Sequence, residues 1–103
     1  MSEPVEDPTF PVTIVDNSGQ LRTEVHYRGE GDPPWWSETG ICQHRVNAAV
    51  QAVEGVEGVE HVHLGLTSSI TLRLYVEVDR SLDRASVKKA LIEALRDVVR
   101  TWL

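Results

Sequence analysis

Several features that would point to a specialised environment are scarce or missing in this 103-residue sequence. It has one cysteine, Cys42, so no disulfide can form within the chain. No apolar run approaches the ~20 residues of a membrane-spanning helix, and the N-terminus lacks the apolar core of a signal peptide. We therefore expect a cytoplasmic protein with no membrane partner, because a free thiol suits a reducing compartment.

An excess of positive charge is also missing, since the formal net charge is −6. Residues 1–40 hold eight acidic and two basic side chains, whereas residues 41–103 hold eight of each. A nucleic-acid-binding surface needs clustered lysine and arginine to neutralise phosphates, so we predict no nucleic-acid partner. Residues 1–9 are acidic and interrupted by proline, which predicts a disordered tail before a single domain at 10–103.

The clearest positive feature is an alternation of apolar and polar residues over 59–78. Every second position of its later part is apolar, namely Ile70, Leu72, Leu74, Val76 and Val78. In its earlier part Val62, Leu64 and Leu66 alternate with His61 and His63. A period of two is typical of half-buried strands. The short connection at 67–69 then predicts an antiparallel hairpin with one apolar and one polar face.

The remaining elements follow from similar signals. Strands are predicted at 12–15 and 21–27 around the turn sequence at 16–19. Helices are predicted from about Gly40 to Val53 and from about Asp83 to the end of the chain. Helices are the natural cover for the apolar face of the sheet. The sequence therefore predicts an α+β two-layer sandwich in the order ββαββα, with an antiparallel sheet and both helices on one face.

The last predicted helix carries more apolar surface than one sheet needs. Its expected core stripe is Val87, Leu91, Ala94, Val98 and Trp102. A second stripe flanks the first and consists of Ile92, Leu95, Val99 and Leu103. Together they exceed the ~100° arc typical of a helix packed on a sheet. The surplus indicates further burial, either against the first helix or against a protein partner, for which a symmetric contact with a second copy is the simplest arrangement.

Two segments carry a resemblance to known families: 56–64, VEGVEHVHL, and 75–82, YVEVDRSL. With the helices around them, they resemble ferredoxin-like small domains. Similar patterns occur in the C-terminal cytoplasmic domain of cation-diffusion-facilitator transporters and in the heavy-metal-associated domain. The helix–Gly–Val–strand passage also resembles alkaline-shock envelope-stress proteins. The resemblance implies a ferredoxin-like second half. Heavy-metal-associated domains carry a C-x-x-C metal loop, and Arg45 stands here where the second cysteine would be.

Metal-ligating residues occur in two pairs, Cys42 with His44 and His61 with His63. Four such ligands could form a tetrahedral zinc site. However, Cys42 is expected on the helix stripe that packs on the sheet, while both strand histidines should face the opposite side. We therefore predict no resident metal and no cofactor. On the polar face His26, His61 and His63 could converge, which leaves a solvated surface, a pH-sensitive contact or a divalent-metal site as alternatives.

Trp35 and Trp36 follow the Pro-containing loop at 29–34. One of them is expected to seal the core, and the other to be exposed as an anchor for a partner. The Cys42–His44 pair lacks the geometry and the third group of a nucleophilic site, so we predict no enzyme.

These observations favour a non-enzymatic interaction or assembly domain that self-associates. Its expected partner-binding residues are Trp35, Trp36, Ile92, Leu95, Val99 and Leu103. One alternative is a divalent-metal-binding or regulatory module that uses the histidines. Another is a small-ligand or peptide-binding protein that uses the Trp35–Trp36 loop.

Overall fold

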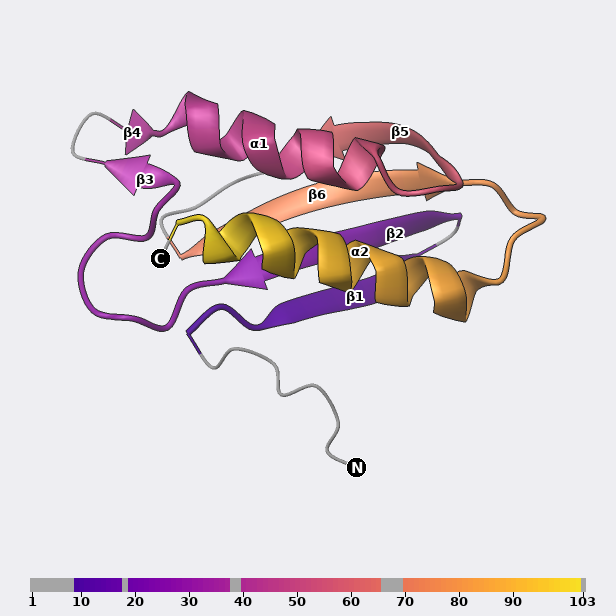
Figure 1. Cartoon of the computed structure of the whole chain (residues 1–103), viewed down its shortest axis with the longest axis horizontal. Helices are drawn as coiled ribbons and strands as arrows, with labels where there is room; N and C mark the ends of the chain where they lie inside the picture. Colours follow the sequence, from indigo (N-terminus) through magenta and orange to yellow (C-terminus); the bar gives the residue numbers. More distant parts are fainter. Residues whose placement is uncertain (1–8, 18, 38–39, 66–69, 103) are drawn as a thin grey trace.

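The structure is a computed structural model that describes residues 9–17, 19–37, 40–65 and 70–102. One antiparallel sheet has the strand order β1-β2-β6-β5. Its strands are β1 (Val12–Asn17), β2 (Gln20–His26), β5 (Val59–Leu64) and β6 (Thr71–Val78). Helices α1 (Gln43–Glu54) and α2 (Arg84–Arg100) lie side by side over one face of the sheet (Figure 1). The opposite face carries no helix among the described residues, and we call it the open face.

The predicted α+β class, with an antiparallel sheet under two helices, is confirmed, but the element order differs from the prediction. Two short strands, β3 (Trp36–Ser37) and β4 (Gly40–Ile41), stand between β2 and α1 and pair with each other. The backbone N–H of Cys42 donates to the carbonyl of Trp35 at 2.7 Å and closes this small hairpin. Gly40 takes a φ of +110°, a conformation that favours glycine. A strand of two residues has no periodicity to detect, so the sequence pattern did not predict it.

The predicted hairpin at 59–78 is confirmed. Strand β6 lies between β2 and β5, and its residues alternate between buried and half-buried along the whole strand. Leu72, Leu74 and Val76 are each 0% exposed and face the helices. Two residues near the ends of the predicted apolar face are exposed and not buried: Ile70 is 62% and Leu64 is 45% exposed. Leu66 lies outside the described residues.

The helices bury a narrower line of residues than predicted. In α1 the buried residues are Val46, Ala49 and Val53, and the helix begins after Cys42, which caps it and is half-buried. In α2 they are Val87, Leu91, Leu95 and Val99, spaced by four. Leu95 and Val99 were predicted for the surplus stripe but lie in the core, because α2 packs against both the sheet and α1. Of the two expectations for this stripe, burial against the first helix therefore holds for Leu95 and Val99.

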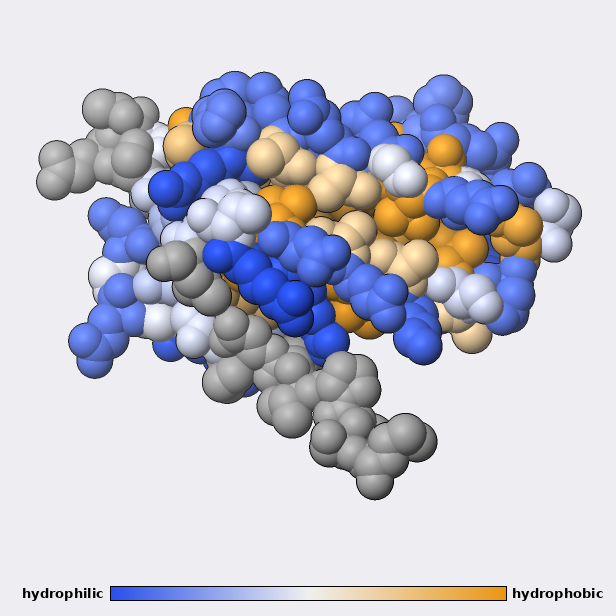
Figure 2. Space-filling model, in the orientation of Figure 1, coloured by the Kyte–Doolittle hydropathy of each residue, from blue (hydrophilic) through white to orange (hydrophobic). Residues whose placement is uncertain are grey.

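Part of the apolar surface remains accessible on the helix side. Figure 2 shows hydrophobic residues gathered between the two helices, with hydrophilic residues on the outer side of each. Half-buried Val50, Ile92 and Val98 are among the residues that pack against the core without full cover. Ile92 therefore keeps some accessible surface, and Leu103 lies outside the described residues.

Trp35 is the centre of an aromatic cluster at one end of the core. It is 0% exposed, and the rings of Phe10, Tyr27 and Trp102 have centroids 6.2, 6.3 and 6.0 Å from its own. The prediction that one tryptophan seals the core is confirmed. Trp36 is half-buried and packs against the same core, so it is not the fully exposed anchor that was predicted.

Candidate functional site

The open face of the sheet carries the polar half of each alternating strand. Strand β2 contributes Arg22, Glu24 and His26; β6 contributes Thr71, Arg73, Tyr75 and Glu77; and β5 contributes His61 and His63. Side chains on neighbouring strands share this face when the strand register pairs them. The register therefore decides which of these groups can act together.

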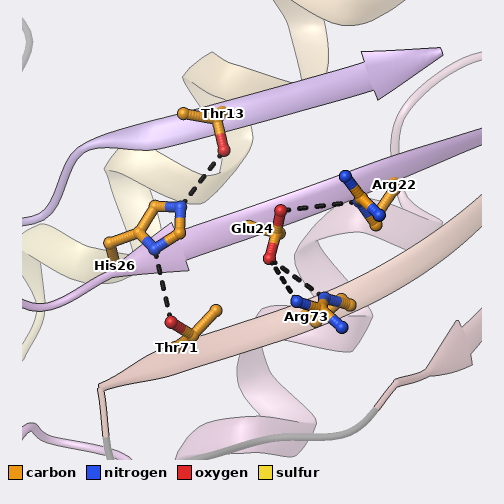
Figure 3. Close-up of polar contacts among 6 residues, drawn as sticks. All are labelled: Thr13, Arg22, Glu24, His26, Thr71 and Arg73. Atoms are coloured by element: carbon orange, nitrogen blue, oxygen red, sulfur yellow. Dashed lines mark hydrogen bonds and ion pairs between the residues drawn. The ribbon is translucent and has the colours of Figure 1, made fainter.

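The carboxylate of Glu24 is the centre of this face. Glu24 is only 8% exposed, and Arg73 donates to its Oε2 through Nε at 3.0 Å and Nη2 at 2.8 Å (Figure 3). Arg22 Nε lies 3.5 Å from the other carboxylate oxygen. The hydrogen bond and charge of Glu24 raise the pKa of the Arg73 guanidinium, which therefore stays charged. A buried carboxylate needs such partners, so this group joins β2 to β6 and has a structural role.

His26 belongs to a different part of the face. Its ring lies between two threonines, with Nε2 at 3.2 Å from Thr13 Oγ1 and Nδ1 at 3.3 Å from Thr71 Oγ1 (Figure 3). In the register His26 is opposite Thr71, whereas His63 is opposite Tyr75. Four residues along β6 correspond to about 13 Å. The prediction that the three histidines could converge is therefore wrong.

His61 and His63 do form a pair. Both are exposed on the open face, and their ring centroids are 6.3 Å apart. His63 Nε2 lies 3.5 Å from Glu77 Oε2, so a carboxylate on β6 neighbours one ring. Cys42 is the half-buried N-cap residue of α1, so it does not lie on the buried helix stripe where it was expected. Within the described part of the chain, no group of three or more His, Cys, Asp or Glu residues is arranged to hold a metal ion.

The outer edge of β5 is the second feature of this region. Within the described residues β5 pairs with β6 alone. Antiparallel strands alternate between residues whose backbone groups bond the neighbouring strand and residues whose groups point away. The N–H of Gly65 donates to the carbonyl of Arg73 at 2.8 Å, so His61 and His63 direct their backbone toward β6. Val62 and Leu64 therefore direct their N–H and C=O groups toward the open edge.

The two edges of the sheet differ in how well they are protected. On β1, Asp16 forms ion pairs with Arg84 at 3.1 Å and Lys88 at 3.9 Å, which tie that edge to α2. Charge and cover of this kind protect edge strands from pairing. Among the described residues no ion pair ties β5 to a helix, and Leu64 exposes 45% of its surface there. A bulge near Val59 disturbs only the start of β5. The β5 edge therefore lacks the charged protection that β1 has, although α1 packs against β5.

The sequence alone did not single out this edge. Val62 and Leu64 were expected only as members of the apolar face, because nothing in the sequence shows which strand ends the sheet. The burial of Glu24 was also missed. No local sequence signal indicates it, because it depends on the place of β2 inside the sheet and on Arg73, which is 49 positions away in the chain.

Neither α1 nor α2 is long and apolar enough to cross a membrane, and the same holds for every helix of the described residues. Comparisons with protein-family models, with curated proteins and with solved structures find no match for this chain. What the domain does is therefore inferred from its own residues.

Proposed function

We propose that this chain is a non-enzymatic interaction domain that self-associates through the β5 edge. The observation that carries this proposal is the pair of residues Val62 and Leu64, whose backbone groups point to an outer edge that pairs with no other described strand. Exposed strand edges are templates for pairing with another chain. When a strand from another chain is added to a sheet edge, main-chain hydrogen bonds provide the affinity and contacts of neighbouring side chains provide the specificity.

A second copy is the partner that this edge fits best. If two β5 strands pair antiparallel around a two-fold axis at Val62, the backbone N–H and C=O of Val62 in one copy bond the C=O and N–H of Val62 in the other. Glu60 then faces Leu64 of the other copy, and His61 faces His63. No acidic residue is opposite another acidic residue, so the edge is complementary to itself. The exposed Leu64 side chain is also the diagonal neighbour of Val62 of the other copy on the same face.

Leu64→Glu tests this proposal. In the paired state the new carboxylate would face Glu60 of the other copy, and the two-fold axis would repeat this repulsion. Val15→Glu is the matched control, because Val15 is a strand residue with similar exposure, 41% against 45%, on β1 at the far side of the sheet. We expect wild type and Val15→Glu to reach the mass of two chains by light scattering at high concentration, and Leu64→Glu to remain at one.

A wild-type protein that stays monomeric at every concentration, with or without added divalent metal, would contradict the proposal. Equal self-association of both variants would show that the contact lies elsewhere, for example at Ile92. Circular dichroism checks that both variants are folded.

Two further predictions remain proposals. A ferredoxin-like second half is supported by the succession α1-β5-β6-α2, in which a hairpin connects two helices on one face. A cytoplasmic location is supported by the free thiol of Cys42. The ligand-binding alternative based on the Trp35–Trp36 loop receives no support, because Trp35 is fully buried.

A further inference from the structure

The exposed side chains of His61 and His63 are neighbours on the open face. Two histidines separated by one residue on a strand share one face, and both rings here point to solvent. Imidazole is a preferred ligand of zinc and of other late first-row divalent ions. Structural zinc needs four ligands, and the pair supplies two. A complete site therefore requires ligands from elsewhere.

The pairing of β5 with a second β5 would supply the other two. In the register centred on Val62, His61 and the partner copy's His63 form a pair without backbone hydrogen bonds between them. Such pairs have Cα atoms about 4.5 Å apart and the closest side chains. Successive residues on one face of a strand are about 6.8 Å apart. Four imidazoles would then surround the two-fold axis on the open face.

We propose that one Zn²⁺ ion bridges two copies of this chain through His61 and His63 of each, an inference that rests on the proposed function. A tetrahedral ion with Zn–N distances of about 2.0 Å brings neighbouring ring centroids to about 5 Å. The rings are now 6.3 Å apart, and as exposed side chains they can close this difference by rotation about their side-chain bonds.

Glu77 supports the same assignment. Its carboxylate lies 3.5 Å from Nε2 of His63, so it can orient this ring and leave Nδ1 for the ion. A carboxylate that accepts the other ring N–H is the usual second partner of a zinc-bound histidine. Glu77 is opposite His61 in the register, so its carboxylate reaches His63 diagonally across the two strands.

The size of the edge contact indicates that the ion controls the association. Pairing of one short strand buries far less than the ~1,200 Å² of a standard stable interface. The contact without metal is therefore weak. An ion that binds only the paired state stabilises that state by linkage, so zinc should convert a weak contact into a stable dimer.

The experiment measures mass and metal content together. Wild type is freed of metal with a chelator, and its mass is followed by light scattering while ZnCl₂ is added. We expect a shift from one chain to two that ends at one zinc ion for every two chains. His61→Ala and His63→Ala should each abolish this zinc-dependent shift. His44→Ala is the matched control, because His44 is also exposed but lies on α1.

The outcomes separate this inference from the proposed function. A dimer that forms equally without zinc and is unaffected by the histidine variants, but is lost in Leu64→Glu, overturns the zinc site and retains the β5 edge. One zinc ion bound per monomer, without a change in mass, also overturns it. If zinc dimerises the protein and Leu64→Glu dimerises equally, the proposed edge fails. If no condition changes the mass, both fail.

Discussion

Replacement of Trp35 by alanine should remove a large part of the stability of this domain. The side chain is 0% exposed and contacts three other aromatic rings at centroid distances of 6.0–6.3 Å. Truncation of a buried tryptophan costs about 3–5 kcal/mol, because apolar burial is lost and a cavity is left. A domain of this size has about 5–15 kcal/mol of total stability, so the variant should lose about a fifth of it or more.

The assay is urea unfolding followed by far-UV circular dichroism, which does not depend on the removed fluorophore. A loss of this size lowers the melting temperature by roughly 15–30 °C in a domain of about 100 residues. Trp36→Ala is the matched control, since Trp36 is adjacent but only half-buried, and its loss should be less than half as large. Trp35→Phe should give an intermediate value and remain folded.

A loss below about 1 kcal/mol for Trp35→Ala would refute this reasoning, because it is far below the ~3–5 kcal/mol expected for truncation of a buried tryptophan. Equal losses for Trp35→Ala and Trp36→Ala would also refute it. Either result would return Trp35 to the set of candidate partner-binding residues.

Two further predictions concern charged groups. Glu24→Gln should lower the melting temperature more than Glu77→Gln. The reason is that Glu24 is 8% exposed and accepts two hydrogen bonds from Arg73, whereas the side chain of Glu77 is 39% exposed. Equal shifts in melting temperature would contradict the structural role of Glu24. The N–H and hydroxyl of Ser81 donate to Asp79 at 2.9 and 2.8 Å and lower its pKa. A lowered folded-state pKa contributes stability above the unfolded value and loses it as the pH falls below about 4. Asp79→Asn should therefore be less stable than wild type at pH 7, and the difference should shrink in acid; a difference that does not depend on pH would contradict this origin.

The sequence predicted well those elements whose burial repeats along the chain. The alternation around Leu72 and Leu74 fixed the faces of β6, because a shift of one residue would turn every apolar side chain to solvent. The helix positions followed from apolar spacing and from the glycines near 55 and 58. In α2 the period was right, but Leu95 and Val99 were assigned to the wrong stripe. The sequence alone does not show which of two adjacent stripes of similar composition is the more buried, because that depends on the packing of α1 beside α2.

The candidate site was less predictable, because it depends on strand order and on pairs that are distant in the sequence. The sequence placed His61 and His63 on one face, which the register supports. It also placed His26 near them, whereas the register puts His26 beside Thr71 at the other end of β6. That β5 ends the sheet follows only from the order of the strands. The ion pair between Glu24 and Arg73 joins residues 49 positions apart, and no local pattern indicates it.

The central claim is that the β5 edge pairs with a second copy, and amide hydrogen exchange at single residues tests it most directly. In the monomer the N–H groups of Val62 and Leu64 point to the open edge and should exchange fast, while those of His61 and His63 point to β6 and should be protected. At high concentration, or with zinc, the account predicts that Val62 and Leu64 become protected as well. Association of the chains while these two amides still exchange fast would contradict it.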